Sequence, residues 1–543
     1  MQKVLLAATM VAASLTGFSQ ARLIPSEKPK LIVEIVVTQM RYDYLQRYSE
    51  NLSANGFKVL MEEGAVCNNA KYSYSLTQSA PGLSTIATGT NPSTHGVVSE
   101  MWYIPLLDQN MRAAQDAKAE GVGGFGELGK YSPRNVLAGT LGDEIKVADP
   151  RSKVIGVSME PTSAVLLTGH SADAAYWFDP STGKFMTSSY YMKSLPKWVD
   201  DFNQKKFPDI YIYNKWGLTK PLASYISSKE HFDTTAKPLL KDPNADGLGK
   251  LFKQKSMPSY QLLVETPFGN NLTKDFAIAT IVNEGLGKDD ATDLLTITLD
   301  ANKHIGRTYG PTSVEMEDTY YRLDEDMAHL LRFLSDNIGK QNVLLVLTSD
   351  NGVANAPKYV SDGKIPSGYF EPNRSLMLLK IYLNATYGRG EWVKSYHQKQ
   401  IFLNRTLIED SNLKLADVQA KAATFMKQFS GIAQAVPSYA LEYTNFTDGV
   451  MQKIQNSFYS QRSGDVIINL QPGWVDTDEE LTSSNSPYSY DTHVPLMWYG
   501  WKVKRETVKS KVDPTDIAPT IATMLNISWP NAASGEPIME LIR

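Results

Sequence analysis

The sequence predicts an α/β fold with a doubly wound, mostly parallel central sheet flanked by helices. Short apolar runs rich in Val, Ile and Leu lie far apart along the chain and end in polar or glycine-rich sequence. They cover residues 31–37, 154–157, 294–299, 343–347, 466–470 and 495–499. Near-continuous runs of this kind are typical of central strands that are covered on both faces. Helical patterns lie between them, and this alternation places a functional site beyond the carboxyl ends of the strands.

Two of the helices can be placed from their patterns. Residues 314–338 carry apolar side chains at helical spacing, namely Leu323, Met327, Leu330, Leu331 and Leu334. A second helix is expected over residues 516–525, because Asp513-Pro514-Thr515 supplies an N-terminal capping signal and an apolar face follows.

Two segments differ from this alternating pattern. Residues 177–271 are rich in Tyr, Lys, Pro and Ser and lack long apolar runs, so we expect an insertion that caps the site. A second insertion is expected at about residues 373–463, which include a helical pattern at 415–429. The remaining sequence, from residue 22 to 543, is expected to form one large domain around these insertions.

The first 21 residues have the features of a secretory leader. Lys3 supplies the positive start, residues 4–15 form a short apolar core, and Ser19-Gln20-Ala21 offers small residues for cleavage. The apolar core is too short to span a bilayer, and no other stretch is long enough. We therefore expect a periplasmic or secreted protein without a transmembrane segment in the mature chain; an uncleaved membrane anchor is the alternative.

Composition narrows the possible partners. The 543 residues carry a net charge of −4 with no basic excess, which argues against nucleic acid as a partner. The single cysteine, Cys67, excludes an intrachain disulfide, and we expect it to be a small buried apolar residue rather than a reactive thiol.

Several motifs together resemble the alkaline phosphatase superfamily, and within it the PafA-type periplasmic phosphatases of Bacteroidetes. They are Thr88-Gly89-Thr90-Asn91-Pro92, Ser349-Asp350-Asn351-Gly352, Gly464-Asp465-Val466, Gln471-Pro472-Gly473-Trp474 and Asp491-Thr492-His493. The resemblance covers most of the mature chain in segment order. It implies an alkaline phosphatase-like fold in which two zinc ions hold a phosphate ester. A Thr or Ser alkoxide on one zinc attacks phosphorus, and water on the other zinc completes hydrolysis.

Most of the chemical groups that the resemblance implies are replaced in this chain. Ser79 falls at the nucleophile, whereas Glu100, Glu160 and Thr162 fall at positions where the family has Asn, Lys and Arg around the phosphate. The zinc-ligand positions fall at Lys303, Arg307 and His493 for one ion, and at Thr38, Asp350 and Asn351 for the other. Asp350 and His493 thus remain as possible ligands, while Thr38 and Asn351 are substituted.

These replacements predict that the chemistry is lost. Catalytic zinc needs at least about three protein donors. Lys303 and Arg307 offer no lone pair, and Glu160 would repel a phosphate dianion. We also expect Asp350 to pair with Arg307 or Lys303, so that a salt bridge replaces the metal cluster.

The leading prediction is a pseudophosphatase that uses no metal and binds an unknown small ligand or a periplasmic or cell-surface protein. The alternative is a zinc-dependent phosphomonoesterase or phosphodiesterase with a reduced or altered metal site and Ser79 as nucleophile. A shift of register that brings in Asp300 and His304 would partly restore a metal site. A purely structural component of the cell surface or of a secretion machinery is the third possibility.

Overall fold

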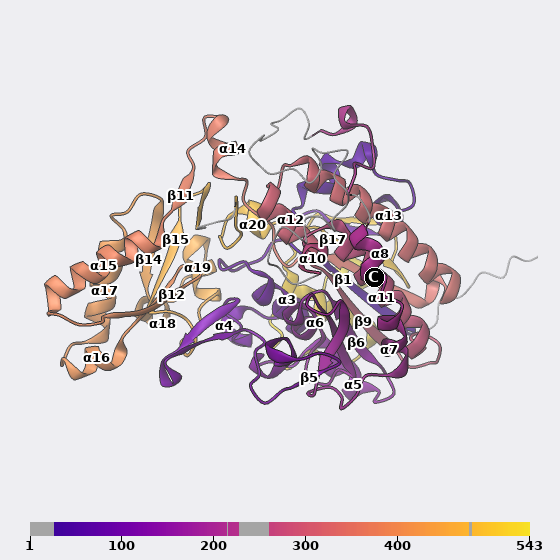
Figure 1. Cartoon of the computed structure of the whole chain (residues 1–543), viewed down its shortest axis with the longest axis horizontal. Helices are drawn as coiled ribbons and strands as arrows, with labels where there is room; N and C mark the ends of the chain where they lie inside the picture. The colour runs from indigo at the N-terminus through magenta and orange to yellow at the C-terminus, as the bar shows by residue number, and fades with distance from the viewer. Residues whose placement is uncertain (1–26, 214–215, 227–259, 477–480, 543) are drawn as a thin grey trace, which may run out of the picture.

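A computed structural model describes residues 27–213, 216–226, 260–476 and 481–542. Their main feature is a ten-stranded sheet with the order β18-β2-β17-β10-β1-β9-β6-β7-β8-β5 (Figure 1). The five strands at its centre are all parallel: β10 (Val343–Thr348), β1 (Leu31–Val37), β9 (Asp293–Leu299), β6 (Val154–Ser158) and β7 (Ala174–Asp179). The predicted mostly parallel sheet is thereby confirmed.

Shorter strands extend this sheet on both sides. On one side stand β17 (Leu496–Gly500), β2 (Ala65–Cys67) and β18 (Glu506–Val508), with β17 antiparallel to β10. On the other side β8 (Lys184–Ser188) runs antiparallel to β7, and β5 (Gly121–Val122) pairs with β8. Five of the six predicted apolar runs lie in this sheet.

Helices cover both faces of the sheet. Alternate residues of β1 point to opposite sides, so Leu31, Val33 and Ile35 join one apolar cluster and Ile32 and Val36 another. The first cluster is covered by α2 (Phe57–Glu63), α11 (Pro267–Glu284) and α13 (Val314–Asn337). The second is covered by α3 (Ser79–Thr88), α5 (Leu141–Ala148), α6 (Pro161–Thr168) and α21 (Ile517–Leu525). Both predicted helices are therefore present, within one residue of their expected ends.

The sixth apolar run, predicted to be a strand of the main sheet, lies elsewhere. It forms β15 (Val466–Leu470) in a separate antiparallel sheet with the order β12-β13-β15-β14. The other three strands are β12 (Val393–His397), β13 (Gln400–Leu403) and β14 (Ile432–Pro437). The prediction was wrong for this run because β15 is equally buried on both faces, and burial of this kind does not specify which sheet a strand joins.

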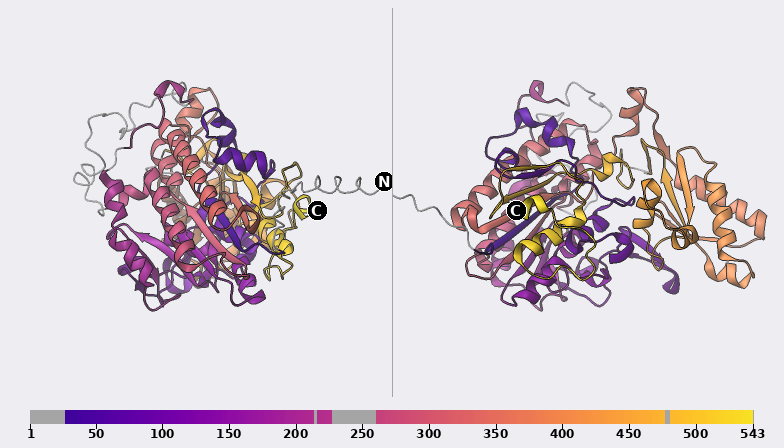
Figure 2. Two further views of the ribbon diagram at one scale, coloured as in Figure 1. Left: turned by 90° about the vertical axis from the view of Figure 1, so that its right-hand side faces the viewer. Right: turned by 180° about the vertical axis from the view of Figure 1, so that it is seen from behind.

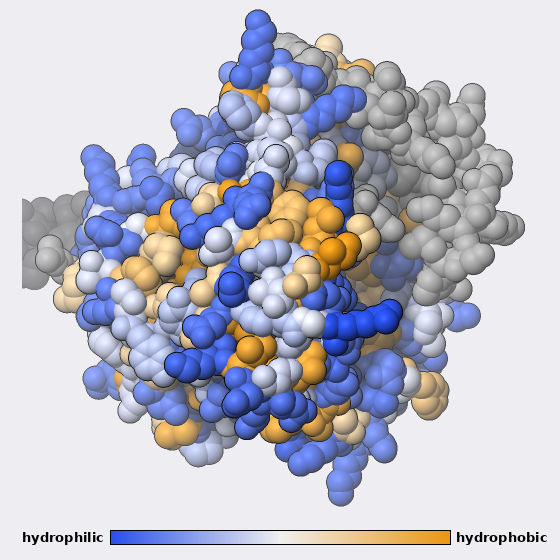
Figure 3. All heavy atoms as spheres, turned by 90° about the vertical axis from the view of Figure 1, so that its left-hand side faces the viewer, coloured by the Kyte–Doolittle hydropathy of each residue, from blue (hydrophilic) through white to orange (hydrophobic). Residues whose placement is uncertain are grey.

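This second sheet and its helices form a lobe beside the main sheet (Figures 1 and 2). α15 (Pro372–Tyr387) and α17 (Leu415–Met426) pack on it around a core of their own. Figure 3 looks onto this end of the molecule, where apolar side chains lie among charged ones; Met377 and Ile381 of α15 are among the exposed apolar residues. The expected insertion at 373–463 forms most of this lobe.

The other expected insertion, at 177–271, is interwoven with the main sheet. It contributes the end of β7, all of β8, and helices α7 (Lys197–Gln204), α8 (Phe207–Tyr213) and α10 (Gln261–Val264). Residues 227–259 lie outside the described part of the chain, as does the predicted leader. Whether either insertion caps a site stays a prediction.

Two buried polar groups in the main sheet stand out. Glu34 lies in the middle of β1 with 1% of its surface exposed, and no described residue donates a hydrogen bond to its Oε1. Burial raises the pKa of its carboxyl to about 8. Cys67 ends β2 and is fully buried, and burial raises the pKa of its thiol to about 12. In the described part of the chain, no helix has the length and apolar character needed to cross a bilayer.

Candidate functional site at the carboxyl ends of the central strands

Four of the site residues follow neighbouring parallel strands. Thr38 follows β1, Asp300 follows β9, Asp350 lies just beyond β10, and Glu160 lies just beyond β6. Because parallel neighbours end at the same edge of the sheet, these side chains are brought to one place. Two helices complete the site: α12 (Ala301–Tyr309) carries Lys303 and Arg307, and α3 begins at Ser79.

Glu160 and Lys303 form the centre of the site. The Lys303 Nζ lies 2.5 Å from Glu160 Oε2, and His304 Nε2 lies 2.7 Å from Glu160 Oε1, so both carboxylate oxygens are occupied. Only 7% of the Lys303 side chain is exposed. Burial opposes ionisation of Glu160, but the charge of Lys303 and the hydrogen bond from His304 outweigh it and hold the pKa of this carboxyl well below its usual range.

Asp300 closes the network from the end of β9. It accepts hydrogen bonds from the hydroxyls of Ser158 and Ser163, the latter at 2.8 Å, and from the Glu160 N–H at 3.2 Å. The Lys303 Nζ is 3.8 Å from its Oδ1. Burial, and then the nearby charge of Glu160, raise the pKa of Asp300, whereas the charges of Glu160 and Asp300 outweigh burial and raise the pKa of Lys303. The charged groups of the site are therefore paired with one another.

The predicted salt bridge of Asp350 is wrong. Asp350 makes no ion pair with Lys303, Arg307 or any other residue in the described ranges, because Lys303 extends from α12 toward the end of β6 and pairs with Glu160. The Asp350 Oδ1 accepts a hydrogen bond from the Gln39 N–H at 2.9 Å, and no described residue donates to its Oδ2. Burial raises the pKa of Asp350, opposed by the Ser79 hydroxyl and the Gln39 N–H.

The start of α3 packs tightly against the end of β10. A Cβ added to Gly82 would lie 2.1 Å from the Asp350 carbonyl oxygen, so only glycine permits this approach. With its amide oriented to satisfy its neighbours, Asn351 accepts a hydrogen bond from the Ser79 N–H at 3.3 Å and donates to the Gly352 carbonyl at 2.7 Å. Ser79, Asp350 and Asn351 are thus brought together as predicted from the sequence.

Glu100 occupies the N-terminus of α3. Its Oε1 accepts a hydrogen bond from the Ala80 N–H at 2.8 Å, and its own N–H donates to Gln78 Oε1 at 3.0 Å. A helix N-terminus favours negative charge and binds anions through its free N–H groups. In this chain the Glu100 carboxylate takes the place that a bound anion would have at the start of α3. Thr162 lies in the first turn of α6, half-buried beside Glu160.

Two expected ligand positions are engaged elsewhere. The Thr38 hydroxyl lies 3.1 Å from the Leu299 carbonyl and 3.2 Å from the Asp300 carbonyl, so it acts as a donor to the backbone. The His493 ring stacks on Tyr42 with a centroid distance of 4.0 Å. Its Nε2 is 3.1 Å from the Asn68 carbonyl oxygen, so this nitrogen carries the proton and has no lone pair to offer a metal.

The residues present do not fit a pair of zinc ions. Asp350 is the one expected ligand that keeps a carboxylate oxygen without a hydrogen-bond donor among the described residues. Across residues 27–213, 216–226, 260–476 and 481–542, no three His, Cys, Asp or Glu side chains gather as a metal site requires. Lys303 adds a buried positive charge where the resemblance implies a metal ligand.

Sequence reasoning missed the partners of Glu160. Asp300 and His304 were considered only as metal ligands in a shifted register, whereas they serve here as the acceptor and donor that close an ion-pair network. One signal was present: Glu160 and Asp300 both follow apolar runs within three residues, and neighbouring parallel strands bring such residues together.

Comparison with known proteins identifies the relatives of this chain. The model of the type I phosphodiesterase / nucleotide pyrophosphatase family matches residues 32–495. A Myroides odoratus protein described as a calcium-transporting ATPase is 38% identical over 541 residues, which cover 98% of this chain and 99% of that protein. Alkaline phosphatase PafA of Elizabethkingia meningoseptica is 34% identical over 550 residues, covering 98% of each chain.

Solved structures give the same relationship. The crystal structure of wild-type PafA aligns with a TM-score of 0.90 and 34% identity over 95% of this chain and 99% of PafA. A PafA variant with one threonine changed to serine, and one asparagine, one lysine and one arginine changed to alanine, aligns with a TM-score of 0.89 and 33% identity over the same shares.

Proposed function

This chain belongs to the type I phosphodiesterase / nucleotide pyrophosphatase family and to the PafA-like alkaline phosphatases, and we propose that it is a catalytically degenerate member that acts by binding. The observation that carries this proposal is the Glu160–Lys303 ion pair, at 2.5 Å. Glu160 stands where the resemblance implies a phosphate-contacting lysine, and Lys303 stands where the resemblance implies a zinc ligand.

The PafA variant supports the assignment of positions. The residue types changed in it are threonine, asparagine, lysine and arginine. These are the types that the resemblance assigns to the positions of Ser79, Glu100, Glu160 and Thr162 in this chain. Two carboxylates and a neutral hydroxyl therefore stand where PafA offers an amide and two cations.

Charge at the site disfavours a phosphate dianion. Glu100 already occupies the N-terminus of α3, and the Lys303 ammonium is held by Glu160 and Asp300. An incoming anion would have to displace a partly buried carboxylate from its partners, and breaking such a pair from one side is costly. A zwitterionic small ligand suits such a mixed-charge site better, and a protein partner could dock on the two expected insertions. With the predicted leader at residues 1–21, we place this binding in the periplasm or outside the cell.

A second candidate function is hydrolysis of phosphate esters at a reduced metal site. Asp350 has a buried Oδ2 to which no described residue donates, and it lies beside Ser79 at the start of α3. Together with the phosphatase relatives, this favours a reduced metal site that uses Ser79 as nucleophile, Asp350 as ligand and zinc as the ion. Because its Nε2 donates to the Asn68 carbonyl, His493 would offer the ion only its Nδ1.

The deciding experiment is the zinc content of the purified chain after saturation and desalting, together with hydrolysis of p-nitrophenyl phosphate and its diester. We expect well below one zinc per chain and no hydrolysis above background. One ion per chain that is lost in Asp350→Ala, with activity lost in Ser79→Ala, would establish the second candidate instead. Two ions per chain would overturn the assignment of the ligand positions.

A further inference from the structure

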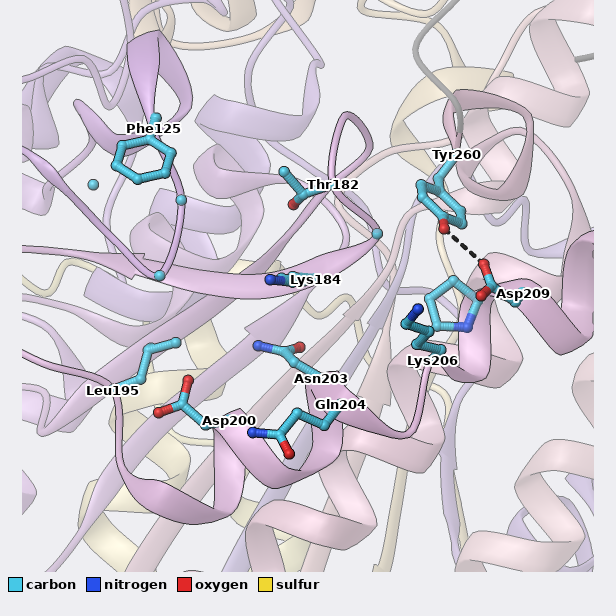
Figure 4. Close-up of a pocket in the computed structure, with 15 residues that line it drawn as sticks. Phe125, Thr182, Lys184, Leu195, Asp200, Asn203, Gln204, Lys206, Asp209 and Tyr260 are labelled. Carbon is cyan, nitrogen blue, oxygen red and sulfur yellow. Dashed lines mark hydrogen bonds between the residues drawn. The ribbon is translucent and has the colours of Figure 1, made fainter.

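A cavity of about 700 Å³ lies at the edge of the main sheet, between β5, β8 and α7 (Figure 4). It shares no residue with the site described above. Its walls are partly bare backbone, because Gly121, Gly123, Gly124 and Gly183 line it. A Cβ on Gly183 would lie 2.6 Å from the Tyr260 ring, and one on Gly124 would lie 2.5 Å from the Met186 sulfur. Side chains at these positions would therefore alter the shape of the cavity, whose volume is in the range of small-molecule sites.

Four exposed polar side chains that line the cavity are free to bind a ligand. Lys184, Asp200, Gln204 and Lys206 make no side-chain hydrogen bond or ion pair with the residues that the structure describes. Asp200 and Gln204 are four residues apart on α7, so their carboxylate and amide lie on one face of the helix, as Figure 4 shows. A carboxylate beside an amide offers acceptors and a donor to adjacent groups of one ligand.

Two other polar residues of the cavity are already satisfied and keep its shape. Asn203 bonds the backbone of Phe185 through both of its amide atoms, at 2.8 and 2.9 Å. Asp209 accepts a hydrogen bond from the Tyr260 hydroxyl at 2.6 Å (Figure 4). The cavity thus combines a fixed frame with unengaged polar groups on α7 and β8.

Phe125 stands at the rim of this cavity with 91% of its surface exposed. Covering an exposed benzyl side chain with a flat apolar surface lowers the free energy, because it removes apolar surface from water. Phe125 and the polar groups on α7 line different parts of the cavity (Figure 4), which thus has one apolar contact surface and one polar wall, the usual composition of a ligand site.

The charges of the lining residues exclude two classes of ligand. Lys184 and Lys206 are balanced by Asp200 and Asp209, so an anion such as phosphate would be attracted and repelled in equal measure. A hydrocarbon would remove water from four polar side chains without replacing their hydrogen bonds. A neutral ring with hydroxyl groups at its edge and C–H groups on its face satisfies both surfaces.

We propose that this cavity binds a neutral oligosaccharide, with one sugar ring on Phe125 and the hydroxyls of a neighbouring ring on Asp200 and Gln204. The proposal does not depend on the loss of catalysis at the Glu160 site, because the two sites share no residue. It assigns a ligand class to a part of the molecule that the phosphatase resemblance leaves without a role.

Saturation-transfer NMR on the full-length mature protein tests this, with maltotriose, cellotriose, chitotriose and xylotriose as separate probes. We expect at least one sugar to receive saturation at its ring protons, and the signal to fall at least fivefold in Phe125→Ala and in Gln204→Ala. Leu106→Ala is the matched control, because Leu106 is 96% exposed in the hairpin of β3 (Met101–Ile104) and β4 (Gln109–Arg112), away from the cavity lining, and its loss should leave the signal unchanged.

Three outcomes would overturn the proposal. They are no transfer to any of the four sugars, an equal signal in Phe125→Ala, and transfer to AMP but to none of the sugars. The last would show that the cavity selects a charged nucleotide. Because the two sites share no residue, we expect these variants to leave zinc content and hydrolysis unchanged, so failure here is distinct from failure of the proposed function.

Discussion

The Lys303 ammonium lies 2.5 Å from the Glu160 carboxylate, and the two residues come from separate elements, α12 and the loop after β6. Without Glu160, the buried Lys303 ammonium would keep only the more distant Asp300 carboxylate, and without Lys303, Glu160 would keep only His304. A buried pair of this kind adds modest net stability but is costly to break from one side. The stability of the altered site therefore depends on keeping both members of the pair.

Removing one member should be worse than removing both. We expect Glu160→Gln to lower the free energy of unfolding by about 3–5 kcal/mol, because Lys303 stays buried with its main partner gone. The double variant Glu160→Leu with Lys303→Met should lose less stability than Glu160→Leu or Lys303→Met alone. Urea unfolding of the four variants measures these losses.

A surface pair provides the control for that series. Lys197 and Asp201 form an ion pair at 2.7 Å with 86% and 48% of their side chains exposed. Lys197→Ala should cost less than about 1 kcal/mol. If Glu160→Gln costs no more than this control, the buried network contributes nothing to stability.

The pH dependence of stability should contain a contribution from Glu34. Its folded-state pKa of about 8 is above the ordinary value of 4.5, so the folded state keeps a proton that the unfolded state releases. Below pH 4.5 both states hold the proton; as pH rises from 4.5 to 8 the folded state loses stability, by up to about 1.4 kcal/mol per pH unit. Above pH 8 this loss levels out.

Glu34→Gln should remove that contribution. We expect the variant to exceed the wild type in stability by a margin that grows from pH 5 to pH 8, as followed by thermal unfolding at each pH. Glu62→Gln, on the exposed face of α2, is the matched control and should run parallel to the wild type. A constant margin between Glu34→Gln and the wild type would show that Glu34 titrates normally.

His493 should behave as a structural residue. His493→Ala removes the stack on Tyr42 and the hydrogen bond to Asn68, so we expect a loss of about 1–2 kcal/mol and no change in zinc content. His493→Phe keeps the stack and should recover part of the loss. A fall in bound zinc in either variant would mean instead that the ring still serves as a ligand.

Restoring the expected ligands should restore metal binding. The fourfold variant Thr38→Asp, Lys303→Asp, Arg307→His and Asn351→His replaces two cations, a hydroxyl and an amide with zinc donors. We expect it to take up zinc where the wild type does not. Adding Asp350→Ala should abolish the uptake, and a fourfold variant that binds no zinc would refute the ligand positions.

The strands and helices were predictable where local pattern decides them. The apolar run of β1 could be read directly, and so could the capping signal at Asp513, which caps the 3-10 helix Pro514–Asp516 that leads into α21, because burial and capping act on neighbours in sequence. The sheet that β15 joins could not, because two-sided burial is the same in either sheet.

The sequence predicted which residues gather at the site, but not which of them form hydrogen bonds and ion pairs with one another. Ser79, Asp350 and Asn351 meet as expected, because α3 and β10 are placed by the fold. Lys303 instead pairs with Glu160, since the direction of a long flexible side chain depends on which carboxylates surround it in space. The orientation of His493 toward Asn68 is likewise a tertiary contact that no local motif encodes.

Cys67 gives the molecule a practical property. It is the one cysteine in the sequence, it is fully buried in β2, and its thiol keeps its proton at neutral pH because burial raises the pKa to about 12. A maleimide reacts with exposed thiolates, so it should leave the native chain unmodified. Cysteines introduced together at Leu106 and Met377 would then carry the only two fluorophores or spin labels, and the separation between the β3–β4 hairpin and the second lobe could be followed without first removing a native thiol.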